Sequence, residues 1–321
     1  MPRTKLLAAV ALSAALALPA TAQELKLTAI NFLPNDQIFG IPLVEFAGIV
    51  NKEGKGAVQV EIRPYGAIPV FEMGNAVKGG VVDIASVPGT FIQNLLPVAD
   101  VTKLIQRTPD ELRQNGGFAL LNELHNQKVN VQLVSVHGQP VPFHIYLRDK
   151  KIDKADLTGL KLRITPVYRA FFRALGGQIV VIAPAEVLTA LERGTVDGYG
   201  WPLWDIKSGG WDKFTKYRVD PGYYYVAGQI MVNLDKWKQL KPETQALLSR
   251  AGLEADKNVF KKQTEMDARY KKEQADAGVQ VITLQGAERE KYIKTAYDAG
   301  WAELEQLDAE NTKKLKPLLS K

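Results

Sequence analysis

The sequence contains no cysteine. This excludes catalytic thiols, zinc–thiolate sites and iron–sulfur clusters, because each of them needs a cysteine sulfur. Only three histidines occur, His125, His137 and His144, and none lies in a metal-binding pattern such as H-E-x-x-H. The chain also lacks a P-loop, a G-x-G-x-x-G turn and a G-x-S-x-G elbow. We therefore expect no cofactor, no bound metal and no catalytic activity.

Charge of one sign is not concentrated in any segment. The formal net charge is +6, but basic and acidic residues alternate, as in residues 257–273. Such mixing is typical of a solvated helix face and does not favour nucleic-acid binding. The small positive balance attracts anionic solutes only weakly at physiological salt.

Long apolar runs are absent except at the N-terminus. Arg3 and Lys5 precede an apolar stretch over residues 6–18, and small residues follow at 20–22. This order predicts a cleaved signal peptide over residues 1–22 and export to the periplasm. A membrane anchor is the alternative, but the run is shorter than the roughly 20 residues of a spanning helix. No later stretch could span a bilayer, so we expect the mature chain to be soluble.

The rest of the chain alternates between strand-like and helix-like patterns, and its apolar fraction of 46% is typical of globular proteins. Strands are predicted at 25–30, 58–62, 81–87, 129–136, 144–147, 161–164, 178–182 and 279–282, with a further β-prone stretch at 223–232. Helices are predicted at 42–50, 72–77, 110–126, 168–175 and 184–194, and a final helix includes residues 292–304. This alternation predicts an α/β fold with a mainly parallel sheet.

One predicted helix is unusually long. Residues 242–277 contain no internal proline, and apolar residues recur at helical spacing. At 1.5 Å per residue the helix would be about 54 Å long, which exceeds the diameter of a small domain. We expect it to bridge two domains; a pair of helices hinged near Gly252 is the alternative.

Three segments in the middle of the chain form a specific pattern. They are D-L-T-G-L-K-L-R over 156–163, A-L-G-G over 174–177, and E-V-L-T-A-L-E-R-G-T-V-D-G over 186–198. The pattern resembles the solute-binding subunits of tripartite ATP-independent periplasmic (TRAP) transporters, the DctP-type family. The resemblance covers residues 24–310.

The resemblance implies a two-lobed α/β periplasmic binding protein with crossing hinge strands and a long interdomain helix. After the signal peptide, domain I would comprise residues 23–141 with 228–268, and domain II residues 142–227 with 269–321. A small organic acid would bind between the lobes and pass to TRAP membrane permease subunits, which an ion gradient drives. No nucleic acid is implied as a partner.

The resemblance also implies a ligand-binding role for Arg163, the arginine that ends the first motif. A guanidinium is a planar fork that suits a carboxylate. His144 occupies the position of a further arginine in sialic-acid-type members, and it could donate a hydrogen bond to an anion or be a core histidine. Glu186 could support the ligand or be an ordinary first-turn acid of a helix.

Aromatic residues are expected to shape the rest of the site. Trp201 resembles the tryptophan of the branch that takes 2-oxo acids, but Gly200 stands where that branch has glutamate, which argues against a bound cation. Phe91, Tyr199 and Trp201 together suggest a cleft wall for a compact acid with an apolar or aromatic body, although they could equally be core residues.

Two other functions remain open from the sequence. One is a binding protein of an ATP-driven importer or a sensor, against which the long helix and the V-D-G segment argue. The other is a periplasmic enzyme acting on an organic acid, for which no catalytic motif is present.

Overall fold

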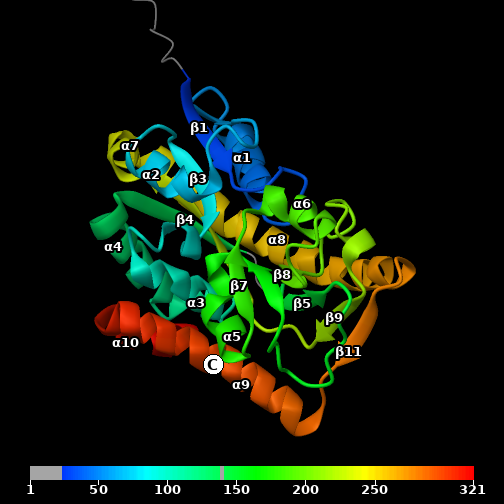
Figure 1. Ribbon diagram of the computed structural model, residues 1–321. Helices are drawn as coiled ribbons and strands as arrows, with labels where there is room; N and C mark the ends of the chain where they lie inside the picture. The colour runs from blue at the N-terminus through cyan, green and yellow to red at the C-terminus, as the bar shows by residue number, and fades with distance from the viewer. Residues whose placement is uncertain (1–23, 138–140) are drawn as a thin grey trace, which may run out of the picture.

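The computed structural model describes residues 24–137 and 141–321, and their strands form two separate sheets (Figure 1). The first sheet has the strand order β2-β1-β3-β10-β4. Its strands are β1 (Leu25–Asn31), β2 (Val58–Ile62), β3 (Ile84–Pro88), β4 (Val131–His137) and β10 (Gly228–Asn233). β1 pairs in parallel with β2 and β3, whereas β10 inserts antiparallel between β3 and β4. We call this sheet with the helices packed on it lobe I.

The second sheet has the strand order β11-β9-β5-β8-β6-β7. Its strands are β5 (Phe143–Leu147), β6 (Lys161–Ile164), β7 (Gln178–Val181), β8 (Gly198–Pro202), β9 (Tyr217–Asp220) and β11 (Gln280–Thr283). β5 is antiparallel to both of its neighbours, while β6 is parallel to β7 and β8. We call this sheet with its helices lobe II. The two sheets confirm the predicted two-lobed α/β fold class.

Helices cover both sheets. The α-helices are α1 (Ile41–Glu53), α2 (Met73–Lys78), α3 (Pro109–Gln114), α4 (Gly117–Val129), α5 (Arg169–Ala174), α6 (Val187–Glu192), α7 (Leu234–Gln239), α8 (Pro242–Asp276), α9 (Gly286–Leu307) and α10 (Ala309–Leu319). Short 3-10 turns are η1 (Val70–Glu72), η2 (Gly89–Ile92), η3 (Pro97–Leu104), η4 (Pro166–Tyr168), η5 (Pro184–Glu186) and η6 (Asp212–Phe214). Within the described residues, no helix combines the length and the apolar character that crossing a membrane requires.

The long helix α8 is continuous over 35 residues and contacts both lobes, as predicted. Its first half packs on β4 and α1 of lobe I. A Cβ added to Gly252 would lie 2.0 Å from the carbonyl oxygen of Val134, so glycine here allows the helix to approach β4 and is not a hinge. In the second half, Tyr270 stacks on Trp204 and Gln274 donates to the Leu203 carbonyl at 2.6 Å.

β4 belongs to lobe I and the next strand along the chain, β5, to lobe II; the chain returns to lobe I between β9 and β10. Helix α9 packs on α5 of lobe II and on η3 of lobe I, so it contacts both lobes, as α8 does. The residue limits of the two domains therefore stay a prediction, because these helices belong to neither lobe alone.

Two predicted elements are wrong in extent. The helix predicted at 110–126 is two helices, because Gly116 adopts a left-handed φ of 86° between them. The β-prone stretch at 223–232 forms a strand only from Gly228 onward. Tyr223 and Tyr224 instead bury their rings among aromatic residues of lobe II, which removes them from the sheet.

Candidate functional site

Arg163 lies near the end of β6 and is fully buried. Its Nε donates to the Ile182 carbonyl at 2.9 Å, and its Nη1 donates to the Tyr168 hydroxyl at 3.0 Å and the Gly200 carbonyl at 3.5 Å. All of these acceptors are neutral. The side chain is therefore held in one orientation by groups that do not balance its charge.

The remaining nitrogen of Arg163, Nη2, is buried and has no hydrogen-bond partner among the described residues. No carboxylate within residues 24–137 and 141–321 pairs with the guanidinium, and the other residues of the chain include no aspartate or glutamate. Burial lowers the pKa of Arg163 from its ordinary value, but a guanidinium remains charged. An uncompensated buried cation costs several kcal/mol, so binding of an anion at this position is favoured.

Gly200 is the position that lets aromatic residues close around this arginine. A Cβ added to Gly200 would lie 2.6 Å from both the Tyr168 ring and the Tyr223 hydroxyl. Tyr168 uses the space to donate from its hydroxyl to the Gly200 carbonyl at 2.6 Å. A glutamate could not fit here unless these aromatic side chains moved.

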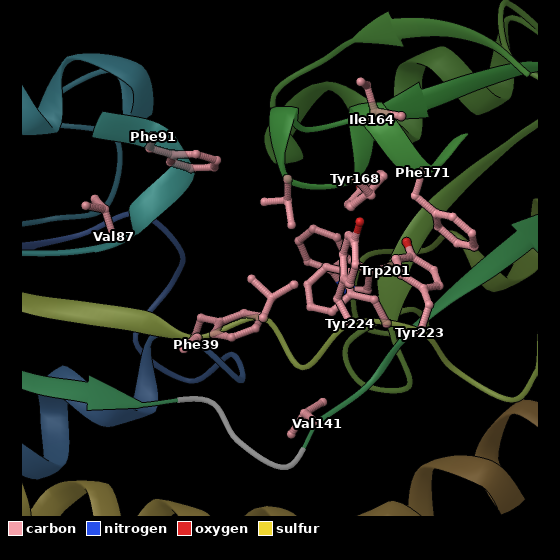
Figure 2. Close-up of a cluster of buried hydrophobic side chains, with 14 of the residues drawn as sticks. Phe39, Val87, Phe91, Val141, Ile164, Tyr168, Phe171, Trp201, Tyr223 and Tyr224 are labelled. Carbon is pink, nitrogen blue, oxygen red and sulfur yellow. The ribbon is translucent and has the colours of Figure 1, made fainter. Parts of the chain in front are cut away.

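A small cavity lies between the lobes, and its lining residue Trp201 lies next to Arg163, which does not itself line the cavity. Its volume is about 20 Å³, room for about one water molecule. The lining contains one hydroxyl side chain, that of Thr165, and no charged side chain. The lining residues are Phe32, Phe39, Pro88, Phe91, Phe143, Thr165, Val167, Pro184, Trp201 and Val226. In Figure 2, Phe39 and Phe91 of lobe I face Trp201 and Tyr168 of lobe II. We call this space the cleft cavity.

The Trp201 ring connects the cleft cavity to the arginine and to a second opening. The Arg163 guanidinium carbon lies 5.5 Å from the centre of the Trp201 ring, a cation–π distance. Trp201 and Pro184 also line a larger cavity of about 210 Å³, which includes Pro34 and Gln37 of lobe I and Asp205 of lobe II. We call this second cavity, which shares Trp201 and Pro184 with the cleft cavity, the mouth.

Asp205 joins the lobes at the mouth. Its Oδ2 accepts a hydrogen bond from the backbone N–H of Ile38 at 2.8 Å, although 167 positions separate the two residues. Burial raises the pKa of Asp205 to about 6; the bond from Ile38 opposes this shift, and the charges of Asp36 and Glu273 add to it. Asp205 has no ion-pair partner within the described part of the chain.

The structure places His144 in a different cavity. Its Nδ1 lies 2.9 Å from Asp220 Oδ1, and Asp220 also accepts two hydrogen bonds from Arg218. The histidine lines a cavity of about 550 Å³ beside the crossing segment, α8 and the start of α9, which shares no lining residue with the cleft cavity. This placement favours a structural role, and its predicted ligand contact stays untested.

The other predicted site residues separate into two groups. Phe91 and Trp201 meet across the cleft cavity. Tyr199 is buried behind them, stacked on Tyr146 and hydrogen-bonded to Thr215 at 2.7 Å. Glu186 is exposed at the start of α6 and lies outside the lining of the cleft cavity. The geometry therefore joins Phe91 to Trp201 at the cleft cavity, and Trp201 to Arg163. Tyr199 pairs with Arg163 across β6 and β8, but neither Tyr199 nor Glu186 lines the cleft cavity.

Sequence reasoning missed several residues of this region. Phe32 and Phe39 lie in the loop after β1, Phe143 begins β5, and Tyr168 ends η4. Their sequence neighbourhoods contain no distinctive spacing, so only the folding of distant segments together shows their role. Within the described residues, no group of three or more histidine, cysteine or acidic side chains could hold a metal ion.

Comparison with known proteins identifies the family. Residues 31–306 match the family described as bacterial extracellular solute-binding protein, family 7, DctP. The chain belongs to this family. The predicted resemblance to TRAP solute-binding subunits is thereby confirmed.

Individual members of the DctP family match at low identity. A monocarboxylate 2-oxoacid-binding periplasmic protein of Nostoc sp. is 24% identical over 61% of this chain, which spans only 57% of that protein. A C4-dicarboxylate-binding periplasmic protein of Rhodobacter capsulatus is 25% identical over 95% of this chain and 87% of its own length.

A solved structure shares the fold. It is a TRAP periplasmic solute-binding protein of Desulfovibrio salexigens with bound orotic acid. Its TM-score is 0.83 at 20% identity, over 92% of this chain and 97% of that one. The similarity supports the two-lobed architecture found here.

Proposed function

We propose that this protein binds a small organic monocarboxylate between its lobes and delivers it to a TRAP-type, ion-gradient-driven membrane transporter. The observation that carries the proposal is the buried guanidinium of Arg163, whose charge no carboxylate of the chain balances and whose Nη2 has no acceptor among the described residues. A carboxylate supplies both the missing charge and the missing acceptor oxygens.

The identity of the anionic group is supported by the family. The proteins named above bind a 2-oxo acid, a C4-dicarboxylate and orotic acid, all of which contain a carboxylate. They differ in the rest of the molecule, so the body of the solute must be inferred from the lining of this cleft.

The lining favours a solute with an apolar or aromatic body. Phe91 and Trp201 present ring faces to the cleft cavity, and Thr165 is its one hydroxyl side chain. A polyhydroxylated sugar acid would leave most of its hydroxyl groups without partners, which costs binding free energy. The cleft cavity has a volume of only about 20 Å³, so an acid with an apolar or aromatic body can enter it only if the lobes separate.

The proposed cellular setting follows the family. The signal peptide predicted at residues 1–22 exports the chain to the periplasm, where the loaded protein meets the membrane permease subunits. Phe91 and Trp201 contact the body of the acid, and Arg163 contacts its carboxylate. The acid is released unchanged, since no catalytic step is proposed.

Thermal-shift screening tests this proposal. The panel contains benzoate, phenylacetate, pyroglutamate, orotate and galacturonate, together with benzamide and phenylacetamide as uncharged controls. A ligand at 100 times its Kd adds about 2.7 kcal/mol of apparent stability. We expect benzoate and phenylacetate to give the largest shifts, galacturonate to give a smaller one, and the two amides to give none.

Substitution of the arginine provides the second arm of the test. Arg163→Met keeps a similar volume and removes the charge, and it should weaken binding of the best acid at least a hundredfold in calorimetric titration. Binding of that acid with unchanged affinity, or equal binding of its amide, would refute the proposed function.

A further inference from the structure

Three buried polar atoms near the cleft have no hydrogen-bond partner among the described residues. They are Nη2 of Arg163, Nε1 of Trp201 and the hydroxyl of Tyr223. Buried polar groups are hydrogen-bonded in the large majority of cases, so each of these needs an explanation. The first two belong to residues already placed at the proposed site, whereas Tyr223 belongs to the crossing segment between β9 and β10.

We infer, on the basis of the proposed function, that the Tyr223 hydroxyl is a second hydrogen-bond donor to the carboxylate of the solute, beside Arg163. Tyr223 is therefore a specificity-determining residue of the site, and it selects an acid whose two carboxylate oxygens both accept a hydrogen bond, one from Arg163 and one from Tyr223. Arg163 alone would supply the charge, but it would not supply a second hydrogen bond that fixes the orientation of the carboxylate.

The position of the hydroxyl supports this inference. A Cβ added to Gly200 would meet the Tyr223 hydroxyl at 2.6 Å, so that hydroxyl lies against the same glycine whose carbonyl accepts from Arg163 and Tyr168. The phenols of Tyr168 and Tyr223 both lie close enough to the guanidinium to act on its pKa. In Figure 2 the Tyr223 side chain lies in the cluster with Tyr168 and Trp201.

Its state of ionisation also fits a donor. Burial raises the pKa of Tyr223 well above its ordinary value, so the phenol keeps its proton at neutral pH. A neutral hydroxyl can donate to an anion without adding a repulsive charge. Phe143, which lines the cleft cavity, has its ring centre 6.5 Å from that of Tyr223.

Two neighbouring tyrosines provide matched controls. Tyr224 is equally buried, but its hydroxyl donates to the Ala296 carbonyl at 2.7 Å. Tyr292 resembles Tyr223 in having a buried hydroxyl without a partner, but it lies on α9, outside the groups around Gly200. Comparing the three separates loss of a ligand contact from loss of a structural hydrogen bond.

The experiment measures calorimetric affinity for the acid that gives the largest thermal shift in the panel above, and the unfolding midpoint without ligand. Tyr223→Phe should weaken binding about tenfold or more, while the ligand-free midpoint stays equal or rises because an unsatisfied hydroxyl is removed. Tyr292→Phe should also keep or raise the midpoint but bind normally. Tyr224→Phe should lower the midpoint and bind normally.

The outcomes are distinguishable. If Tyr223→Phe binds the acid within twofold of the wild-type protein while Arg163→Met does not bind it, only the inference about Tyr223 is wrong. An equal loss of affinity in Tyr292→Phe would also overturn it, because the effect would then not be specific to the site. If no acid binds the wild-type protein, the proposed function fails, and the inference fails with it.

Discussion

Lys103 and Arg163 are both buried cations, and their surroundings differ completely. Lys103, on η3, donates to Asp100 at 2.7 Å and to Glu303 of α9 at 2.9 Å. Within the part of the chain that the structure describes, Arg163 on β6 donates only to neutral acceptors, and its Nη2 has no acceptor. Two carboxylates balance the charge of Lys103, which joins α9 to lobe I, whereas no carboxylate balances the charge of Arg163 at the cleft. This difference distinguishes a structural ion network from the proposed anion-binding site.

The largest expected effect is on the paired cation. Lys103→Met leaves Asp100 buried without its partner, and breaking a buried pair in this way costs about 3–5 kcal/mol. We expect this loss in the free energy of unfolding measured with urea, while the affinity for the best acid stays unchanged in folded protein. A loss below 1 kcal/mol would show that Lys103 and Arg163 are equally dispensable to the fold and would remove the contrast.

Asp205 sharpens the comparison, since it is a buried acid with no ion-pair partner. Burial raises its pKa from 3.8 to about 6, so between pH 4 and pH 6 the folded protein binds a proton here that the unfolded chain does not bind. Stability contributed at this position therefore falls as pH rises from about 4 to 6. Asp205→Asn keeps an acceptor for Ile38 and should be about 2 kcal/mol more stable than wild type at pH 7.5, but not at pH 4.

The measurement for Asp205 is urea unfolding of both proteins at the two pH values. The Lys103 network is the same in both proteins, so its contribution cancels when their stabilities are compared. A stability difference that is the same at pH 4 and pH 7.5 would contradict the assignment of the proton to Asp205.

The unpaired cation should affect stability little. Without ligand, Arg163→Met replaces a charge that nothing balances by an apolar side chain, so the free energy of unfolding should remain within about 1 kcal/mol of wild type or increase. Circular dichroism during thermal unfolding of the ligand-free variant checks this. Destabilisation as large as that of Lys103→Met would mean that Arg163 is a structural residue.

The smallest effect is expected at His144. Its Nδ1 contacts Asp220, which Arg218 also holds, so His144→Gln should lower stability by about 1 kcal/mol at most. Because the histidine lines the cavity near the crossing segment, affinity for the acid should change less than about threefold, or about 0.65 kcal/mol. A tenfold loss in titration would instead restore the ligand-binding role predicted from the sequence.

Sequence reasoning identified Arg163 because a long motif surrounds it. In the structure, Asp197 of the same motif accepts a hydrogen bond from the Lys161 N–H at 2.8 Å. His144 could not be placed in the same way. Phe143 and His144 are adjacent on one strand and point to opposite faces, so which of them meets the cleft depends on the packing of β5 between β8 and β9.

The amino-acid sequence alone determined the α/β class, the span of α8 and the family, because periodicity and motif spacing are local properties of the chain. Only the tertiary structure decided that Arg163 lacks a counter-charge, that Gly200 makes room for Tyr168 and Tyr223, and that Phe39 and Phe91 close the cleft from lobe I. These features depend on contacts between segments distant in sequence, and burial and hydrogen bonding are settled only when those segments pack together.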